Sequence, residues 1–133
     1  MDEDNITILQ AFEWYSPPGL WKRLRERLPT FKSMGIDHLW VPPGSKASNA
    51  QSNGYDLYDL YDLGEFDWKG SRAIKWGTKE ELMGLSKAAK EIGIGLIWDA
   101  VLGVSMEPLP VFVVGLLVLW ANLGCCFGRL ERC

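Results

Sequence analysis

Three apolar segments separated by two amphipathic ones constrain the fold of this chain more than any other feature of its sequence. The apolar segments are residues 6–14, 36–41 and 94–102, and each is nearly continuous in hydrophobic side chains. Such runs are typical of strands that are buried on both faces of a parallel sheet. The sequence therefore predicts an α/β fold in which strands alternate with crossover helices. A small open sheet and part of a barrel satisfy this pattern equally well.

The two segments between the strands have helical periodicity. Residues 20–34 place apolar side chains three or four positions apart and charged side chains between them. Pro29 lies inside this pattern and should bend or interrupt the helix. The second predicted helix covers residues 78–92 and begins with Thr78 and Glu81, which have the spacing of a capping box.

A long polar loop, residues 44–76, separates the second strand from the second helix, and it contains an unusual repeat. Tyrosine and aspartate recur with a period of three in Asn53-Gly-Tyr-Asp-Leu-Tyr-Asp-Leu-Tyr-Asp-Leu-Gly-Glu-Phe66. This period matches neither the helix nor the strand, so neither would bury the pattern on one face. An ordered loop with flat rings and carboxylates suits sugars, whose ring faces stack on aromatics and whose hydroxyls need acceptors. A purely structural loop is the alternative.

Size and charge exclude several classes of protein. The chain has 133 residues, too few for a complete (β/α)8 barrel of about 250. Its 14 basic and 17 acidic side chains give no electrostatic footprint for nucleic acid. No His or Cys pair has the spacing of a metal site, so we expect neither a metal nor another cofactor. No secretory signal is visible at the N-terminus, which predicts a cytoplasmic protein.

Several motifs in the same order resemble the opening of α-amylases of glycoside hydrolase family 13, most closely the intracellular and bacterial liquefying branch. They span residues 5–102 and comprise Gln10-Ala-Phe-Glu-Trp-Tyr15, Trp21-Lys-Arg-Leu24, Gly35-Ile-Asp-His-Leu-Trp-Val-Pro-Pro43, the tyrosine-aspartate loop, Trp76-Gly-Thr78 and Gly93-Ile-Gly-Leu-Ile-Trp-Asp-Ala-Val-Leu102. The resemblance implies a partial (β/α)8 TIM barrel, truncated after about three strands and two helices. Residues 1–102 would form this partial catalytic domain, and residues 103–133 a divergent hydrophobic tail.

The resemblance also implies roles for individual residues. Tyr55 would stack on the sugar ring beside the scissile bond, with Trp14 nearby at the end of the first strand. The alternative is that Tyr55 packs against Trp14 or Trp98. Asp99 would support the site by bonding an arginine further along the chain, and that partner is missing here.

The family's Asp-x-x-x-Asn-His motif, which Asp99 opens, is not matched at its last two positions. Gly103 stands where relatives carry an asparagine that binds structural calcium, and Val104 replaces a histidine that contacts substrate. Neither side chain can coordinate calcium or donate a hydrogen bond.

The catalytic carboxylates of the family lie on strands that this sequence does not contain. Retaining glycosidases need two carboxyl groups about 5–5.5 Å apart, yet only Glu107 and Glu131 follow Asp99, in unrelated contexts. We therefore predict no catalytic residues and no hydrolysis of the α-glucan on which intact relatives act. The alternative function is a non-enzymatic, membrane-associated remnant that binds sugars or partners weakly.

The tail allows two interpretations. Residues 109–127 contain no charged side chain and, as a helix, would span roughly 28 Å, close to a bilayer core. They could form a transmembrane helix, which would place the protein at a membrane, or be translated non-coding sequence. An incomplete barrel also leaves a strand edge and apolar surface exposed, which predicts aggregation or chaperone binding.

Overall fold

The computed structural model describes residues 5–102 and 117–120, and its centre is a sheet with the strand order β1-β2-β5-β6. The first three of these strands run parallel, whereas β6 runs antiparallel to β5. The elements, in chain order, are β1 (Ile8–Gln10), α1 (Leu20–Ser33), β2 (His38–Val41), β3 (Lys46–Ala47), β4 (Leu57–Asp59), α2 (Lys79–Glu91), β5 (Gly95–Ala100) and β6 (Leu117–Trp120). The predicted partial (β/α)8 arrangement is confirmed, although each strand is shorter than its apolar run.

Both predicted helices are present and end within two residues of their expected bounds. Pro29 lies inside α1 without interrupting it. The capping box of α2 is formed in both directions, because the Thr78 side chain accepts from the Glu81 backbone and the Glu81 side chain accepts from the Thr78 backbone. A cap of this kind stabilises a helix by about 1 kcal/mol.

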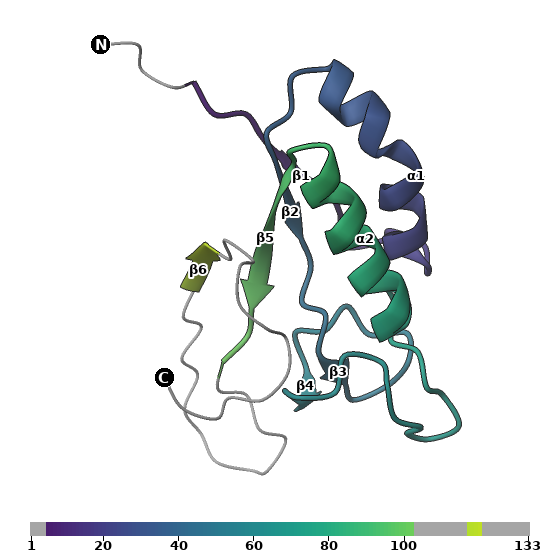
Figure 1. Ribbon diagram of the computed structural model, residues 1–133. Coiled ribbons are helices and arrows are strands. Elements are labelled where there is room, and N and C mark those ends of the chain that lie inside the picture. The colour runs from purple at the N-terminus through teal and green to yellow at the C-terminus, as the bar shows by residue number, and fades with distance from the viewer. Residues whose placement is uncertain (1–4, 103–116, 121–133) are drawn as a thin grey trace, which may run out of the picture.

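The hydrophobic core lies between the sheet and the helices, which cover one face of the sheet (Figure 1). On that face Leu39 and Val41 of β2 are fully buried. On the opposite face, β1 and β2 place Ile8 next to His38 and Gln10 next to Trp40, because these residues pair in the register of the two strands. On this face Ile8 is 55% exposed, whereas Ile97 of β5, which pairs with Trp40, is 7% exposed.

Strand β6 lies within the tail for which two interpretations were open. The sequence allowed a transmembrane helix over residues 109–127 or translated non-coding sequence, and in the structure residues 117–120 pair with β5 as an antiparallel strand. The rest of that segment lies outside the described residues. Within residues 5–102 and 117–120 there is no helix with the length and hydropathy needed to cross a bilayer.

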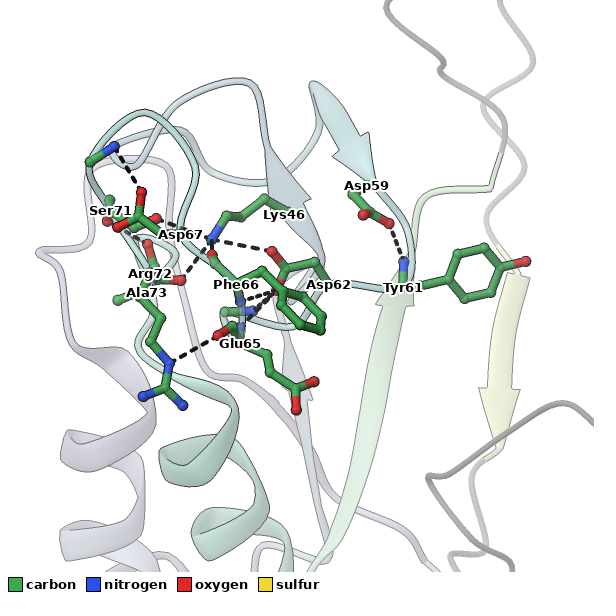
Figure 2. Close-up of polar contacts among 12 residues, drawn as sticks. Lys46, Asp59, Tyr61, Asp62, Glu65, Phe66, Asp67, Ser71, Arg72 and Ala73 are labelled. Atoms are coloured by element: carbon green, nitrogen blue, oxygen red, sulfur yellow. Dashed lines mark hydrogen bonds and ion pairs between the residues drawn. The ribbon is translucent and has the colours of Figure 1, made fainter.

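The long loop is organised around a buried ion pair between Lys46 of β3 and Asp62. Their side chains are each 5% exposed, and the ammonium lies 3.3 Å from the carboxylate. The ammonium also donates to three backbone carbonyls, those of Phe66 at 2.7 Å, Arg72 at 2.6 Å and Ser71 at 3.3 Å (Figure 2). One lysine therefore joins two distant parts of the loop.

The carboxylate of Asp62 is satisfied just as completely. Its Oδ1 atom accepts from three successive backbone N–H groups, those of Gly64, Glu65 and Phe66 (Figure 2). Burial by itself raises the pKa of Asp62, but these three donors and the Lys46 ammonium together hold it below its ordinary value of 3.8. The charged form is therefore the one that the fold stabilises.

Replacing Lys46 should destabilise the chain strongly. In Lys46→Met the carboxylate of Asp62 stays buried without its counter-ion and three carbonyls lose their donor, so we expect a loss of about 3–5 kcal/mol. Urea unfolding followed by circular dichroism measures this difference. Lys22→Met is the matched control, because Lys22 is exposed on α1 and its replacement should change the free energy of unfolding by less than about 0.5 kcal/mol. Equal losses in the two variants would contradict the role of the ion pair.

The lowered pKa of Asp62 also predicts a pH dependence. The folded state binds this proton less readily than the unfolded state, so the contribution of Asp62 is complete well above pH 3.8 and is lost as the pH falls through the lower folded value. We expect the free energy of unfolding to fall more steeply below pH 4 in the native chain than in Asp62→Asn. Parallel pH curves for the two proteins, from urea titrations between pH 2 and pH 6, would contradict this assignment.

Candidate functional site

The candidate site lies at the carboxyl ends of the parallel strands, where three predicted residues meet. Trp14 follows β1, Asp99 is the fifth residue of β5, and Tyr55 reaches both from the long loop. The rings of Trp14 and Tyr55 stack with centroids 5.9 Å apart and planes 12° from parallel. The Tyr55 hydroxyl donates to Asp99 Oδ2 at 2.7 Å.

Asp99 is 8% exposed, and its hydrogen-bond partner is Tyr55, whereas the arginine that the family resemblance implied is missing from this sequence. A buried carboxyl group needs such a hydrogen bond, because an uncompensated charge there costs several kcal/mol. Burial, the hydrogen bond to Asp99 and the charge of that group raise the pKa of Tyr55 above its usual range. The tyrosine therefore keeps its proton and acts as the donor.

Of the two packing partners considered for Tyr55, the structure selects Trp14. Trp98 instead lies over Gly44, where an added Cβ would come within 2.2 Å of its ring. Trp14 is 62% exposed and Tyr55 is 36% exposed, so the stacked pair remains open to solvent. We call this pair the aromatic platform.

Two residues that the sequence analysis did not single out hold the platform in place. Asn53 Nδ2 donates to the Trp14 carbonyl at 2.9 Å, and Lys75 Nζ lies 3.4 Å from the same oxygen. Lys75 Nζ also donates to Asn53 Oδ1. The only sequence signal was the position of Asn53 at the start of the tyrosine-aspartate repeat, next to Gly54 and Tyr55.

Gly54, between Asn53 and Tyr55, has a conformation and surroundings that require glycine. Its φ of +97° lies in the region that side chains disfavour. An added Cβ would meet the Pro43 carbonyl oxygen at 2.7 Å and Pro43 Cβ at 2.9 Å. The backbone therefore passes directly against Pro43, just beyond the end of β2. This contact fixes the positions of Asn53 and Tyr55, which flank Gly54.

An open groove runs beside the platform and combines aromatic rings with polar side chains. Tyr15, which is 85% exposed, stands on one side of it. The lining residues are Trp14, Tyr15, Ser16, Pro17, Pro18, Asn49, Gln51, Ser52, Asn53 and Lys75.

Comparison with known proteins decides the family. The family model of the α-amylase catalytic domain matches residues 2–107. The chain belongs to the α-amylase catalytic-domain family. It is 47% identical over 105 residues to the cytoplasmic alpha-amylase of Escherichia coli and 40% identical over 99 residues to an alpha-amylase of Geobacillus stearothermophilus. These matches cover 77% and 73% of this chain but 21% and 18% of the relatives, so the chain spans about a fifth of their length.

Two solved structures share the fold of this chain. A hypothetical maltooligosyl trehalose synthase of Sulfolobus tokodaii matches 71% of the chain, and 12% of its own length, with a TM-score of 0.54 and 27% identity. The trehalulose synthase MutB of Pseudomonas mesoacidophila matches 71% of the chain and 16% of its own length, with a TM-score of 0.55 and 24% identity. The second likeness supports the fold alone.

The calcium site implied by the family resemblance does not fit this chain. Gly103, which stands at the position of an asparagine ligand, has no side-chain oxygen and lies outside the described residues. Among residues 5–102 and 117–120, no three His, Cys, Asp or Glu side chains gather closely enough to hold a metal ion.

Substituting Gly54 tests how the site is built. Gly54→Ala combines an unfavourable φ with a collision against Pro43, so we expect a loss of stability of about 2–4 kcal/mol. Gly70→Ala is the matched control, because Gly70 has a φ of +78° but open space around its Cβ position, and only the backbone strain of about 1 kcal/mol should appear. Thermal unfolding measures both. Equal destabilisation would show that the contact with Pro43 is unimportant.

Proposed function

We propose that this chain forms part of the glucan-binding surface of an α-amylase-type catalytic domain. The observation that carries the proposal is the exposed aromatic platform, with Tyr55 bonded to Asp99 at the carboxyl ends of the strands. A pyranose ring has an apolar face that would stack on the exposed side of the platform, and sugar hydroxyls would bond polar groups around it. Trp14 and Tyr55 would bind the sugar, and Asp99 would support Tyr55 from below.

The hydrogen bond to Asp99 is what gives Tyr55 a defined position. The hydroxyl stays protonated and points into the sheet, so the ring edge is tethered and its face is left for stacking. Preorganised rings bind sugars at a lower cost in entropy than mobile ones. The arrangement therefore favours binding through a ring face over binding through the tyrosine hydroxyl.

Hydrolysis by the 133-residue polypeptide itself is not part of the proposal. A retaining mechanism needs a nucleophile and an acid/base about 5–5.5 Å apart. Asp99 is committed to Tyr55, and the exposed Glu13 accepts from the backbone of Tyr15 at 2.7 Å. Only Glu107 and Glu131 follow in the sequence, without the family's motifs. We propose binding in the cytoplasm without bond cleavage.

Two measurements on the purified chain test this function. We expect no reducing ends to be released from amylose, and calorimetry with maltoheptaose should give a dissociation constant near 1 mM, equivalent to about 4 kcal/mol. Trp14→Ala should weaken binding about 3–10-fold, because it removes one ring of the platform.

Tyr61→Ala controls for the loss of an exposed ring, since Tyr61 is 79% exposed and points away from Lys46 and Asp62 (Figure 2). It should bind maltoheptaose like the native chain. Release of reducing ends would contradict the absence of catalysis, and unchanged binding by Trp14→Ala would contradict the role of the platform.

A further inference from the structure

We propose that Asn53 and Lys75 form a latch that positions the aromatic platform, and that the affinity of the platform for an α-glucan depends on this latch. The sugar-binding part of this inference rests on the proposed function, whereas the positioning part does not. Both residues act through Trp14 and are positioning residues.

Trp14 needs an external tether because it lies beyond the sheet. The ladder of β1 ends at Gln10, and one further backbone bond joins Ala11 to the Trp40 carbonyl at 2.8 Å. The turn that contains Trp14 is closed by local bonds, with Glu13 N–H donating to Ser16 Oγ at 2.9 Å. Local bonds define the shape of this turn but do not fix its position relative to the long loop.

The latch supplies that connection across the chain. Asn53 is 39 positions from Trp14 in sequence and donates to its carbonyl. Lys75 is 61 positions away and shares the same acceptor. Since Lys75 also donates to Asn53 Oδ1, the three residues form a closed triangle of hydrogen bonds.

The latch is itself anchored to the core. Trp76, which is 1% exposed, donates its indole N–H to the Asn53 carbonyl at 3.2 Å. The Lys75 ammonium lies 4.6 Å from the centre of the Trp76 ring, and the Lys75 carbonyl accepts from Gly19 N–H at 2.9 Å. Through the latch, Trp14 is therefore connected to the buried Trp76 and to the start of α1.

The latch also connects the two rings of the platform. Asn53 and Tyr55 flank Gly54, whose backbone is pressed against Pro43. One short segment therefore holds Trp14 through the Asn53 amide and stacks on it through the Tyr55 ring. Without the latch the Tyr55 ring would remain tied to Asp99, but Trp14 would be free to leave it.

Fluorine NMR of the full chain labelled with 5-fluorotryptophan tests the positioning directly. The Trp14 resonance is identified by its absence in Trp14→Phe. We expect Asn53→Ala and Lys75→Met each to shift and broaden this resonance while leaving that of Trp21, buried in the core, unchanged. Lys75→Arg, which retains a cation with several donors, should restore the native Trp14 resonance.

Two further variants separate the components of the latch. Asn53→Asp keeps an acceptor for Lys75 but loses the donor to Trp14, so its Trp14 resonance should move in the same direction as that of Asn53→Ala. Lys22→Met is the matched control for Lys75→Met, because Lys22 is exposed on α1 and does not line the groove. It should leave the Trp14 resonance unchanged.

The outcomes distinguish this inference from the proposed function. A native Trp14 resonance in both Asn53→Ala and Lys75→Met would overturn the latch, whether or not the chain binds sugar. If the latch is confirmed, maltoheptaose affinity should fall about 3–10-fold in these two variants and remain native in Lys22→Met. A native chain that binds no maltoheptaose, with a shifted Trp14 resonance in the variants, would reject the proposed function and the sugar-binding part of the inference but retain the latch itself.

Discussion

The buried pair of Lys46 and Asp62 is the interaction on which the rest of the site depends. The loop between β2 and α2 carries Asn53, Gly54 and Tyr55, and it has little regular structure beyond β3 and β4 to hold it. A buried charge must be paired and fully hydrogen-bonded, or the desolvation cost destabilises the fold. Here the ammonium and the carboxylate meet that condition by bonding the loop backbone. The contacts that compensate the two buried charges therefore also hold the loop in its conformation.

The helices and parallel strands could be predicted from sequence because their signals are local. Apolar spacing, the capping box at Thr78 and the near-continuous strand at Gly95–Ala100 depend on neighbouring residues, and all appear in the structure. Strand ends were overestimated, because hydrophobic residues continue beyond the last ladder bond: Phe12 follows β1 but packs on Trp40 and Trp76.

The contacts that assemble the site could not be predicted, because they join residues far apart in sequence. A lysine in a polar loop is expected to be solvated, but Lys46 is 4% exposed. No feature of the sequence around it indicates that Asp62 is its partner. The bond from Asn53 to Trp14 spans 39 positions. Tyr55 and Asp99 were both singled out, but their hydrogen bond was not, since the implied partner of Asp99 was an arginine absent from this sequence.

The proposed binding surface and the carboxylates of a retaining mechanism would come from different parts of an α-amylase fold. The platform, its latch and its supporting acid all come from the first three parallel strands and the segments that follow them. An acid/base pair at bonding distance from a glycosidic oxygen needs further strands, parallel to β5 and adjacent to it. In this chain that edge of β5 pairs with β6 in the antiparallel direction, which no next strand of a (β/α)8 barrel could adopt. The same sheet therefore supports the aromatic platform and carries β6 at the edge where the next parallel strand of a barrel would pair.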